Sequence, residues 1–186
     1  YLGRRQVNLR EPRSERNVKT PADLAGVNLR MPGSDAWQFL GKALGANPTP
    51  MAFTEVYTAL QTGAVDGQDN PLPTVVDAKF YEVTKQIVLT SHLVDLNYIA
   101  ISKAVWDGLS AENQATLQAA ADAAADSGRA EQLKKEEDLV SFLTAQGLDV
   151  YEPDLNAFRT QVQGMYLESD LAKDWPAGVL DKINGL

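Results

Sequence analysis

The chain contains no cysteine and a single histidine, so several kinds of chemistry are excluded from the start. Without cysteine there are no disulfides, no thiolate zinc sites and no cysteine nucleophiles. With His92 as the one histidine, a His-rich metal site is impossible and any Ser-His-Asp scheme depends on that residue. The lack of cysteine fits both a cytosolic protein and a bacterial periplasmic one, so it does not decide the compartment.

Long apolar runs and an excess of basic residues are also missing. No hydrophobic stretch approaches the roughly 20 residues needed to cross a membrane. Lysine and arginine number 17 against 25 acidic residues, and the net charge of −8 argues against nucleic acid as a partner. The sequence has neither a GxGxxG fingerprint nor a P-loop. Asp66 and Asp69 lie close together, but no second acidic motif suggests an acid/base pair.

The 186 residues that are present suffice for one domain with a good core or for two small lobes. Strand-like and helix-like pieces alternate in the first half, and a charged, loop-like stretch occupies residues 9–19. We expect strands at residues 5–9, 27–31, 49–53, 65–70, 85–92 and 96–102, and helical segments at 21–26, 35–44 and 54–63. This alternation with short loops predicts an α/β lobe with a mainly parallel sheet.

The second half is mostly helical. Ser110 is the expected N-cap of a helix that runs to Gly147 with no internal proline. If continuous, this helix is roughly 55 Å long, which exceeds the width of a small domain. It therefore either bridges two lobes or kinks near Gly128. A short strand follows, and Asp154 is expected to cap a last helix.

Arg30 is the leading candidate for binding an anion. It is the last polar residue of the strand expected at 27–31, and Pro32-Gly33 and a helix N-terminus follow directly. Ligands of open α/β sheets collect at the carboxyl ends of strands, and a helix start adds free N–H groups. A guanidinium can hold a carboxylate through two parallel hydrogen bonds. The alternative is a solvated arginine at a strand end.

Phe53 and Asn70 end two further expected strands, so a parallel sheet brings both to the edge where Arg30 lies. Phe53 then supplies an apolar wall, and Asn70 supplies amide donors and an acceptor. The alternatives are core packing for Phe53 and a turn position before Pro71 for Asn70. We expect a ligand site at this edge because all three residues converge there.

Trp37 and His92 are less specific candidates. Trp37 lies in the first turn of the helix after Gly33, where it either lines the same cleft or packs on the sheet. His92 ends the strand expected at 85–92, and it either donates to an anion or a bridging water, or is a strand-end histidine satisfied by the protein. The stretch KKEEDL is interpreted as a solvated helix face.

The chain resembles the solute-binding proteins of tripartite ATP-independent periplasmic (TRAP) transporters, the DctP family, in TPADLAGVNLRMPG, ALGANPTPMAFTEVYTALQTGAVDGQDNP and KFYEVTKQIVLTSH. The resemblance implies a bilobed α/β fold of the type II periplasmic-binding-protein kind, a Venus flytrap. In that fold, residues 1–95 are a ligand-binding lobe, 96–109 a crossover strand, 110–147 a lobe-spanning helix and 148–186 the C-terminal strand and helices.

The resemblance also implies a function without catalysis, cofactor or required metal. The protein would capture a small organic acid in the periplasm and deliver it to the TRAP membrane permease. Arg30, in NLRMP, matches the arginine that pairs with the ligand carboxylate. Phe53, in PMAF, matches an apolar contact to the ligand, and Asn70, in DGQDNP, matches an amide contact.

Further positions of the family's site are matched around these three. Arg5, in GRRQ, matches a second arginine, and Arg10 stays an alternative because the connection between Arg5 and Arg16 is longer than expected. His92, in LTSH, matches a position near the site. Gly33 stands where some sialic-acid binders have a polar residue after the proline, which puts a sialic acid ligand in doubt.

Family members carry a further N-terminal stretch of roughly one lobe's size. Because this sequence opens at Tyr1 without a signal peptide, we expect it to be the later part of a longer protein, with the N-terminal lobe largely absent. Two rival functions stay open. One is a ligand-sensing module of the same fold, and the other is an α/β enzyme using Asp66 or Asp69.

Overall fold

A computed structural model describes residues 3–10 and 17–185 of the chain. Its centre is a seven-stranded sheet in the order β3-β2-β4-β1-β5-β7, with β6 paired to β1 off this path. The charged stretch expected as a loop at 9–19 falls partly outside the described residues. The strands of the described chain are β1 (Gly3–Leu9), β2 (Asn28–Met31), β3 (Asn47–Pro50), β4 (Gly67–Pro71), β5 (Gln86–Val88), β6 (Val94–Asp95) and β7 (Asp149–Tyr151).

The sheet is mixed, so the expectation of a mainly parallel sheet is wrong. β2 pairs in parallel with β3 and β4, and β5 pairs in parallel with β7. β1 runs antiparallel to β4, β5 and β6. A period-two pattern identifies a strand but says nothing of its direction, because direction depends on partners that lie far away in the sequence.

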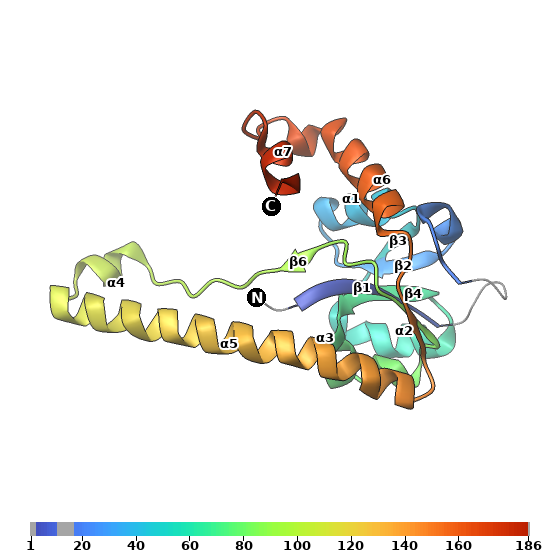
Figure 1. The fold of residues 1–186 in the computed structure, drawn as a ribbon, viewed down its shortest axis with the longest axis horizontal. Helices are drawn as coiled ribbons and strands as arrows, with labels where there is room; N and C mark the ends of the chain where they lie inside the picture. Colours follow the sequence, from blue (N-terminus) through green and yellow to red (C-terminus); the bar gives the residue numbers. More distant parts are fainter. Residues whose placement is uncertain (1–2, 11–16, 186) are drawn as a thin grey trace.

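Helices cover both faces of this sheet (Figure 1). α1 and α6 pack on one face over a core that includes Val7 and Leu29, whereas α2, α3 and the C-terminal end of α5 cover the other face over a core that includes Ile87. The described α-helices are α1 (Asp35–Ala43), α2 (Val56–Thr62), α3 (Leu72–Asp77), α4 (Lys103–Asp107), α5 (Ala111–Ala145), α6 (Leu155–Leu167) and α7 (Val179–Asn184), and the 3-10 helices are η1 (Pro21–Leu24), η2 (Phe53–Glu55), η3 (Phe80–Glu82) and η4 (Asp170–Ala172).

Two glycines end helices as the sequence predicts. Gly63 is the left-handed C-cap of α2, with a φ of 79°. Gly45 follows α1 with a φ of 96°, and a Cβ there would lie 2.3 Å from the carbonyl oxygen of Pro21. Glycine is therefore required at position 45 both by the backbone conformation and by the close approach of η1.

The predicted caps of the C-terminal helices are confirmed. The hydroxyl of Ser110 accepts a hydrogen bond from the Asn113 N–H at 3.2 Å, and the carboxylate of Asp154 accepts one from the Ala157 N–H at 3.0 Å. Ser34 precedes α1 in an extended conformation but makes no side-chain cap hydrogen bond. Each cap residue satisfies one of the N–H groups that a helix start leaves without an intrahelical partner.

α5 is one continuous helix of 35 residues, so the kink allowed for near Gly128 is absent. Its length is about 52 Å. The C-terminal end packs on the sheet through the buried Leu143, while the N-terminal half projects from it together with α4 (Figure 1). Searched over the described residues, none of the helices is both long and apolar enough to span a membrane.

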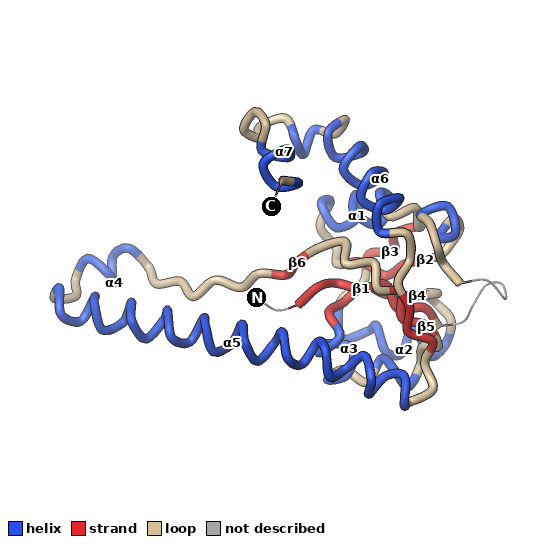
Figure 2. Tube along the Cα trace, viewed as in Figure 1, coloured by secondary structure: helices blue, strands red, loops and turns tan. Residues whose placement is uncertain are grey.

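Two expected strands are wrong in position. β3 ends at Pro50, and Phe53 begins η2 instead of ending a strand. β3 contains two prolines, which lack the N–H that a central strand must donate, and it accordingly lies at the edge of the sheet. Residues 96–102 form no strand, and β6 covers only Val94–Asp95 (Figure 2). The apolar alternation at 96–102 has no partner strand among the described residues.

Candidate functional site

Three adjacent strands bring Arg30, Asn70 and Arg5 to one edge of the sheet, namely the edge formed by the C-terminal ends of β2 and β4. β4 lies between β2 and β1, and β2 and β4 run in parallel, so the C-terminal ends that carry Arg30 and Asn70 meet at the same edge. Because β1 is antiparallel, its N-terminal half lies at that edge, with Arg5 opposite Pro71. The predicted convergence therefore holds for Arg30 and Asn70, whereas Phe53 begins η2 instead of ending a strand, and Arg5 reaches the same edge through a reversed strand.

The two arginines point to opposite faces of the sheet. Residues that lie opposite each other on neighbouring strands share a face, and alternate residues of one strand do so too. Arg30 lies opposite Gln68, and Gln68 lies opposite Asn8, on the face covered by α2 and α3. Asp69 lies opposite Val7, and it shares the face covered by α1 with Arg5.

Arg30 is buried but keeps free hydrogen-bond donors. Its Nε and Nη2 donate to the Met51 carbonyl oxygen at 3.0 and 2.8 Å, and its Cζ lies 6.0 Å from the centre of the Phe53 ring. Burial lowers the pKa of Arg30, while the charge of Asp69 opposes this shift and the charge of Arg5 adds to it. No acceptor in the described part of the chain pairs with Nη1 of Arg30, so part of a charged fork is available to a ligand.

The guanidinium of Arg5 is instead occupied by protein carboxylates. Its Nε donates to Oδ2 of Asp69 at 2.6 Å and its Nη2 to Oδ1 of Asp69 at 3.1 Å, a two-pronged ion pair. Nη1 donates to Oδ2 of Asp95 at 2.7 Å, and the Trp37 ring lies 4.4 Å below Cζ. Burial would lower the pKa of Arg5, but the hydrogen bonds and charges of Asp69 and Asp95 outweigh it and raise the pKa.

His92 completes the surroundings of Asp69. Its Nε2 lies 3.3 Å from Oδ2 of Asp69, and its Nδ1 lies 2.7 Å from the Thr90 hydroxyl. The distances fit a ring that donates from Nε2 while Nδ1 accepts from the hydroxyl. Burial would raise the pKa of Asp69, but the hydrogen bonds from His92 and Arg5 hold it below its usual range. Both ring nitrogens of His92 thus have protein partners, which favours the interpretation of a satisfied histidine that supports the site indirectly.

A row of buried amides orients Asn70. Nη2 of Arg5 lies 3.4 Å from Oδ1 of Asn70, and an arginine can only donate, so the amide oxygen of Asn70 faces it. The amide nitrogen of Asn70 then donates to Gln68, whose own amide nitrogen donates to Asn8. Nδ2 of Asn8 is buried without a partner in the described structure. Asn70 is therefore held in one orientation and is not a surface turn residue.

The structure also locates the remaining predicted residues. Phe53 is 47% exposed beside Arg30 and touches Phe80 edge-on, so it forms part of a wall. Trp37 packs against the core, which was the second of its two predicted placements, and its ring also lies under Arg5. Gly33 is exposed, and a Cβ added there would meet nothing within 4 Å.

Arg10 and Asp66 lie at the opposite end of the sheet from this edge. The N–H of Arg10 donates to the Asp66 carbonyl at 2.8 Å, just beyond the C-terminal end of β1. Arg5, not Arg10, is therefore the second arginine at the edge. Asp66 precedes β4, and its carboxylate accepts a hydrogen bond from the Asn28 N–H at 2.8 Å instead of pairing with Asp69.

Sequence reasoning missed the partners that fix these side chains, namely Asp69 as a counterion, Asp95 and Gln68. One signal was present for two of them. Gln68, Asp69 and Asn70 are consecutive polar residues in the strand expected at 65–70, and polar residues need partners where a strand is buried, as β4 is at every position. Asp95 carried no such signal.

Two cavities adjoin the edge without including Arg30. One of about 540 Å³ lies between residues 90–94 and the helices α6 and α7, and it includes His92 and Arg159. The other, of about 220 Å³, lies between β1 and α5 and includes Gln6 and Glu136. No cluster of three His, Cys, Asp or Glu side chains suited to a metal ion exists among the described residues.

Comparison with known proteins identifies the family of the chain. Residues 7–171 match the family described as bacterial extracellular solute-binding protein, family 7, or DctP. The sialic acid-binding periplasmic protein of Vibrio cholerae is 42% identical over 161 residues, which cover 87% of this chain and 50% of that protein. The 2,3-diketo-L-gulonate-binding periplasmic protein of Escherichia coli is 37% identical over 162 residues, covering 87% and 49%. The chain thus spans about half the length of these relatives.

Solved structures show the same relationship. A TRAP periplasmic solute-binding protein from Roseobacter denitrificans with bound 3-deoxy-D-manno-oct-2-ulosonic acid (KDO) is 74% identical, has a TM-score of 0.93, and is covered to 61% by the whole of this chain. A second protein from that organism, with bound L-galactonate, is 33% identical with a TM-score of 0.77, and 92% of this chain covers 56% of it. These relatives are solute-binding proteins and not enzymes, as the resemblance implied. The chain therefore belongs to the bacterial extracellular solute-binding protein family 7, the DctP family of TRAP transporters.

Proposed function

We propose that this chain is the arginine-bearing lobe of a TRAP solute-binding protein that captures a sugar acid, of the KDO type, in the periplasm. The observation that carries the proposal is the 74% identity, over the whole of this chain, to a protein with KDO bound. Three other relatives bind sialic acid, diketogulonate and galactonate, which are also polyhydroxylated acids. A carboxylate on a sugar-like body is thus shared by the ligands of these four relatives.

Arg30 is the residue that we assign to the carboxylate. Its surface is only 4% exposed, it keeps its charge, and its Nη1 has no protein partner, so an incoming carboxylate finds an open donor. A charge-assisted hydrogen bond contributes about 1.5–3 kcal/mol net. Micromolar binding requires about −8 kcal/mol, so Arg30 supplies only part of the affinity.

The remaining affinity comes from neighbouring groups and from closure. Asn70 presents an oriented amide beside Arg5, and Phe53 offers an apolar ring beside Arg30. A second lobe, of the kind that the relatives' greater length provides, would cover the ligand and exclude water, which strengthens each polar contact. The closed protein would then deliver the acid to the TRAP permease in the membrane.

KDO is preferred over sialic acid in this proposal. Identity to the KDO-bound protein is 74%, against 42% to the sialic acid-binding protein. Gly33, with nothing near its missing Cβ, offers no side chain to a larger ligand at the position where some sialic-acid binders carry a polar residue.

Titration calorimetry on the natural protein with KDO, L-galactonate and sialic acid tests the proposal. We expect saturable binding of KDO without turnover, and we expect Arg30→Ala to weaken it at least tenfold, a loss of about 1.4 kcal/mol, with an unchanged circular dichroism spectrum. The matched control is Arg129→Ala, on the exposed face of α5, which leaves binding unchanged. An Arg30→Ala protein that binds KDO as tightly as the wild type would overturn the assignment.

A further inference from the structure

Asn8, Gln68 and Asn70 form a row of three buried side-chain amides, which we call the amide row. Gln68 lies opposite Asn8 in the pairing of β1 with β4, and Asn70 follows two residues along β4 on the same face. All three residues are at most 6% exposed. Because water has little access to them, the hydrogen bond that one amide makes decides what the next amide can donate or accept.

The direction of the hydrogen bonds in the amide row is set by Arg5. An arginine can only donate, so the amide oxygen of Asn70 faces Nη2 of Arg5 at 3.4 Å. The amide nitrogen of Asn70 then donates to Gln68, and the amide nitrogen of Gln68 donates to Asn8. The direction imposed at the edge of the sheet is thus passed along β4 and across to β1.

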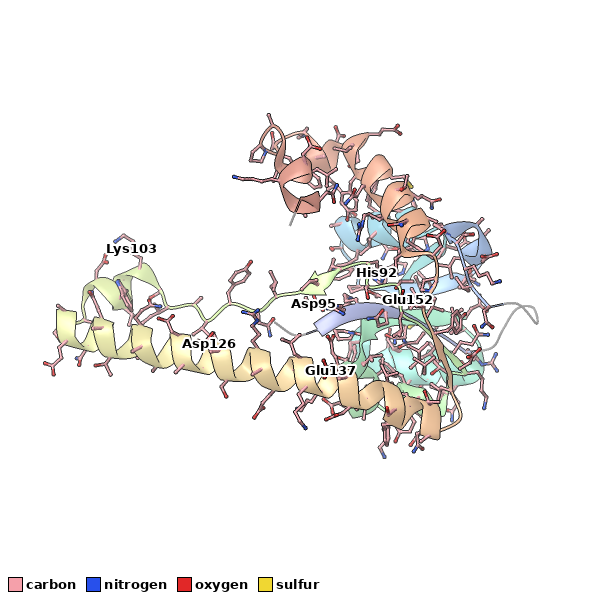
Figure 3. All side chains as sticks on the ribbon, viewed as in Figure 1. His92, Asp95, Lys103, Asp126, Glu137 and Glu152 are labelled. Atoms are coloured by element: carbon pink, nitrogen blue, oxygen red, sulfur yellow. The ribbon has the colours of Figure 1, made fainter. Side chains whose placement is uncertain are left out.

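The two ends of the amide row differ in how well they are satisfied. Arg5 is a fixed end, because Asp69 and Asp95 hold its guanidinium, and Asp95 is seen beside the start of β1 in Figure 3. At the other end, Nδ2 of Asn8 is buried and has no partner in the described part of the chain. A buried N–H without a partner is rare in folded proteins and destabilises them. With Arg5 at one end, the row therefore places an unpaired donor inside the core.

The opposite direction is the only other way to keep both links of the amide row. Turning each amide over makes Asn8 donate to Gln68 and Gln68 donate to Asn70, which leaves the amide nitrogen of Asn70 at the edge. The N–H of Asn8 is then paired, and an amide oxygen takes its former place. A buried carbonyl without a partner is tolerated better than a buried N–H. Arg5 opposes this direction, because two donors would face each other.

We infer that an acceptor oxygen of the captured acid reverses the amide row, so that Asn70 turns its amide nitrogen to the ligand. This inference rests on the proposed function. Arg30 lies opposite Gln68, on the face that Gln68 shares with Asn70, so an acid held by Arg30 stands beside the end of the row. The acid accepts the N–H that Arg5 cannot accept. Asn8 and Gln68 are thus positioning residues, which act on the ligand through Asn70.

The amide row makes the site selective for a ligand group that accepts hydrogen bonds. Reversal moves the unpaired N–H from Asn8, where nothing accepts it, to Asn70, where the ligand does. A carboxylate oxygen only accepts, so it pairs with Asn70 only when the row is reversed. A ligand that presents an amine or an amide N–H at this point leaves the row as it is and gains no such stabilisation.

Side-chain amide signals in NMR spectra of the natural protein test the reversal directly. We expect the amide protons of Asn8 to move downfield when KDO is added, because Nδ2 gains an acceptor on Gln68. Asn70→Asp without ligand should produce the same shift, because residue 70 then only accepts and Gln68 must donate to it. Asn156, an exposed residue of α6, is the control, and its amide signal should stay in place. An Asn8 signal that stays in place when KDO binds overturns the inference.

Asn8→Asp separates the reversal from a merely structural role. An aspartate at position 8 accepts from Gln68 but cannot donate, so the row is locked with the amide oxygen of Asn70 outward. KDO should bind at least tenfold more weakly by calorimetry, because two acceptors then face each other. Gln6→Glu is the matched control for the added charge. Gln6 lies opposite Asn70, nearer the edge than Asn8, and its amide oxygen accepts from the Ser91 N–H at 2.9 Å.

The two variants and the spectra give distinct outcomes. A loss of affinity in Gln6→Glu as large as in Asn8→Asp would mean that charge alone explains the effect, and the inference would be wrong. If Asn8→Asp does not fold, the NMR comparison decides, because it needs no change at position 8. Failure of the wild type to bind KDO instead overturns the proposed function, and the spectrum of Asn70→Asp without ligand then decides alone whether the row reverses.

Discussion

Arg5 and Arg30 flank the central strand β4 at the same edge of the sheet, and both are almost fully buried, yet they are paired in different ways. Arg5 meets Asp69 and Asp95, two full negative charges, while Arg30 meets the neutral carbonyl of Met51. Removing one partner of a buried ion pair leaves an unpaired charge and destabilises the fold, whereas a guanidinium with an open donor is available for a ligand. This contrast predicts a structural role for Arg5 and a ligand-binding role for Arg30.

The largest effect is expected for Arg5→Met. This change leaves the buried carboxylate of Asp69 without its main counterion, and breaking such a pair costs about 3–5 kcal/mol of unfolding free energy. Urea unfolding at neutral pH measures the loss. Adding Asp69→Leu should restore at least half of it, because the unpaired charge is then gone. If Arg5→Met alone costs less than about 1 kcal/mol, the ion pair is not what stabilises this edge.

Lowering the pH should weaken the same ion pair of Arg5 with Asp69. The pKa of Asp69 is held below its ordinary value of 3.8 by His92 and Arg5, so the stabilisation is complete above that value and is lost as the pH falls below it. The difference in unfolding free energy between wild type and Asp69→Asn should be constant from pH 7 to 5 and should narrow below about pH 4. Asp138→Asn, at an exposed pair with Lys134, serves as the control and should follow the wild type. A difference that widens in acid would mean that the carboxylate is not the stabilised form.

The comparison also shows which features of the fold can be predicted from the sequence alone. The strand at 27–31, the helices after Ser34 and Phe53, and the convergence of Arg30 with Asn70 follow from periodicity and from glycine and proline punctuation. These are local signals. The antiparallel course of β1 is not local, because its partners on β4 and β5 lie far along the chain.

The same limit applies to the site. Arg30 is recognisable because a strand end, a proline–glycine break and a helix start follow one another in the sequence. The pairing of Arg5 with Asp69 and Asp95 joins residues 64 and 90 positions apart, and no spacing rule predicts it. The prediction of a strand at 96–102 is wrong for a related reason. An apolar alternation becomes a strand only if another strand pairs with it.

A smaller effect is expected for Arg30→Lys. Lysine retains the charge but cannot reach the Met51 carbonyl and a ligand carboxylate with one planar fork. KDO binding should weaken about tenfold, with about 1 kcal/mol lost from the unfolding free energy. Calorimetry and urea unfolding on the same samples separate the two losses. If stability falls as far as in Arg5→Met, then Arg30 is a structural residue and the division of roles is wrong.

The smallest effect is expected for Phe53→Leu. The ring centre lies 6.0 Å from Cζ of Arg30, at the outer limit of a cation–π contact, and such a contact contributes about 0.5–1 kcal/mol at an exposed site. Leucine keeps an apolar wall but removes the ring, so KDO affinity measured by calorimetry should fall by less than about fivefold. Tyr81→Leu removes a ring that packs on Phe142 of α5, away from Arg30, and should leave the affinity unchanged. A loss for Phe53→Leu that matches Arg30→Lys would mean that the ring packs directly on the bound acid, because a contact with Arg30 alone cannot supply that much.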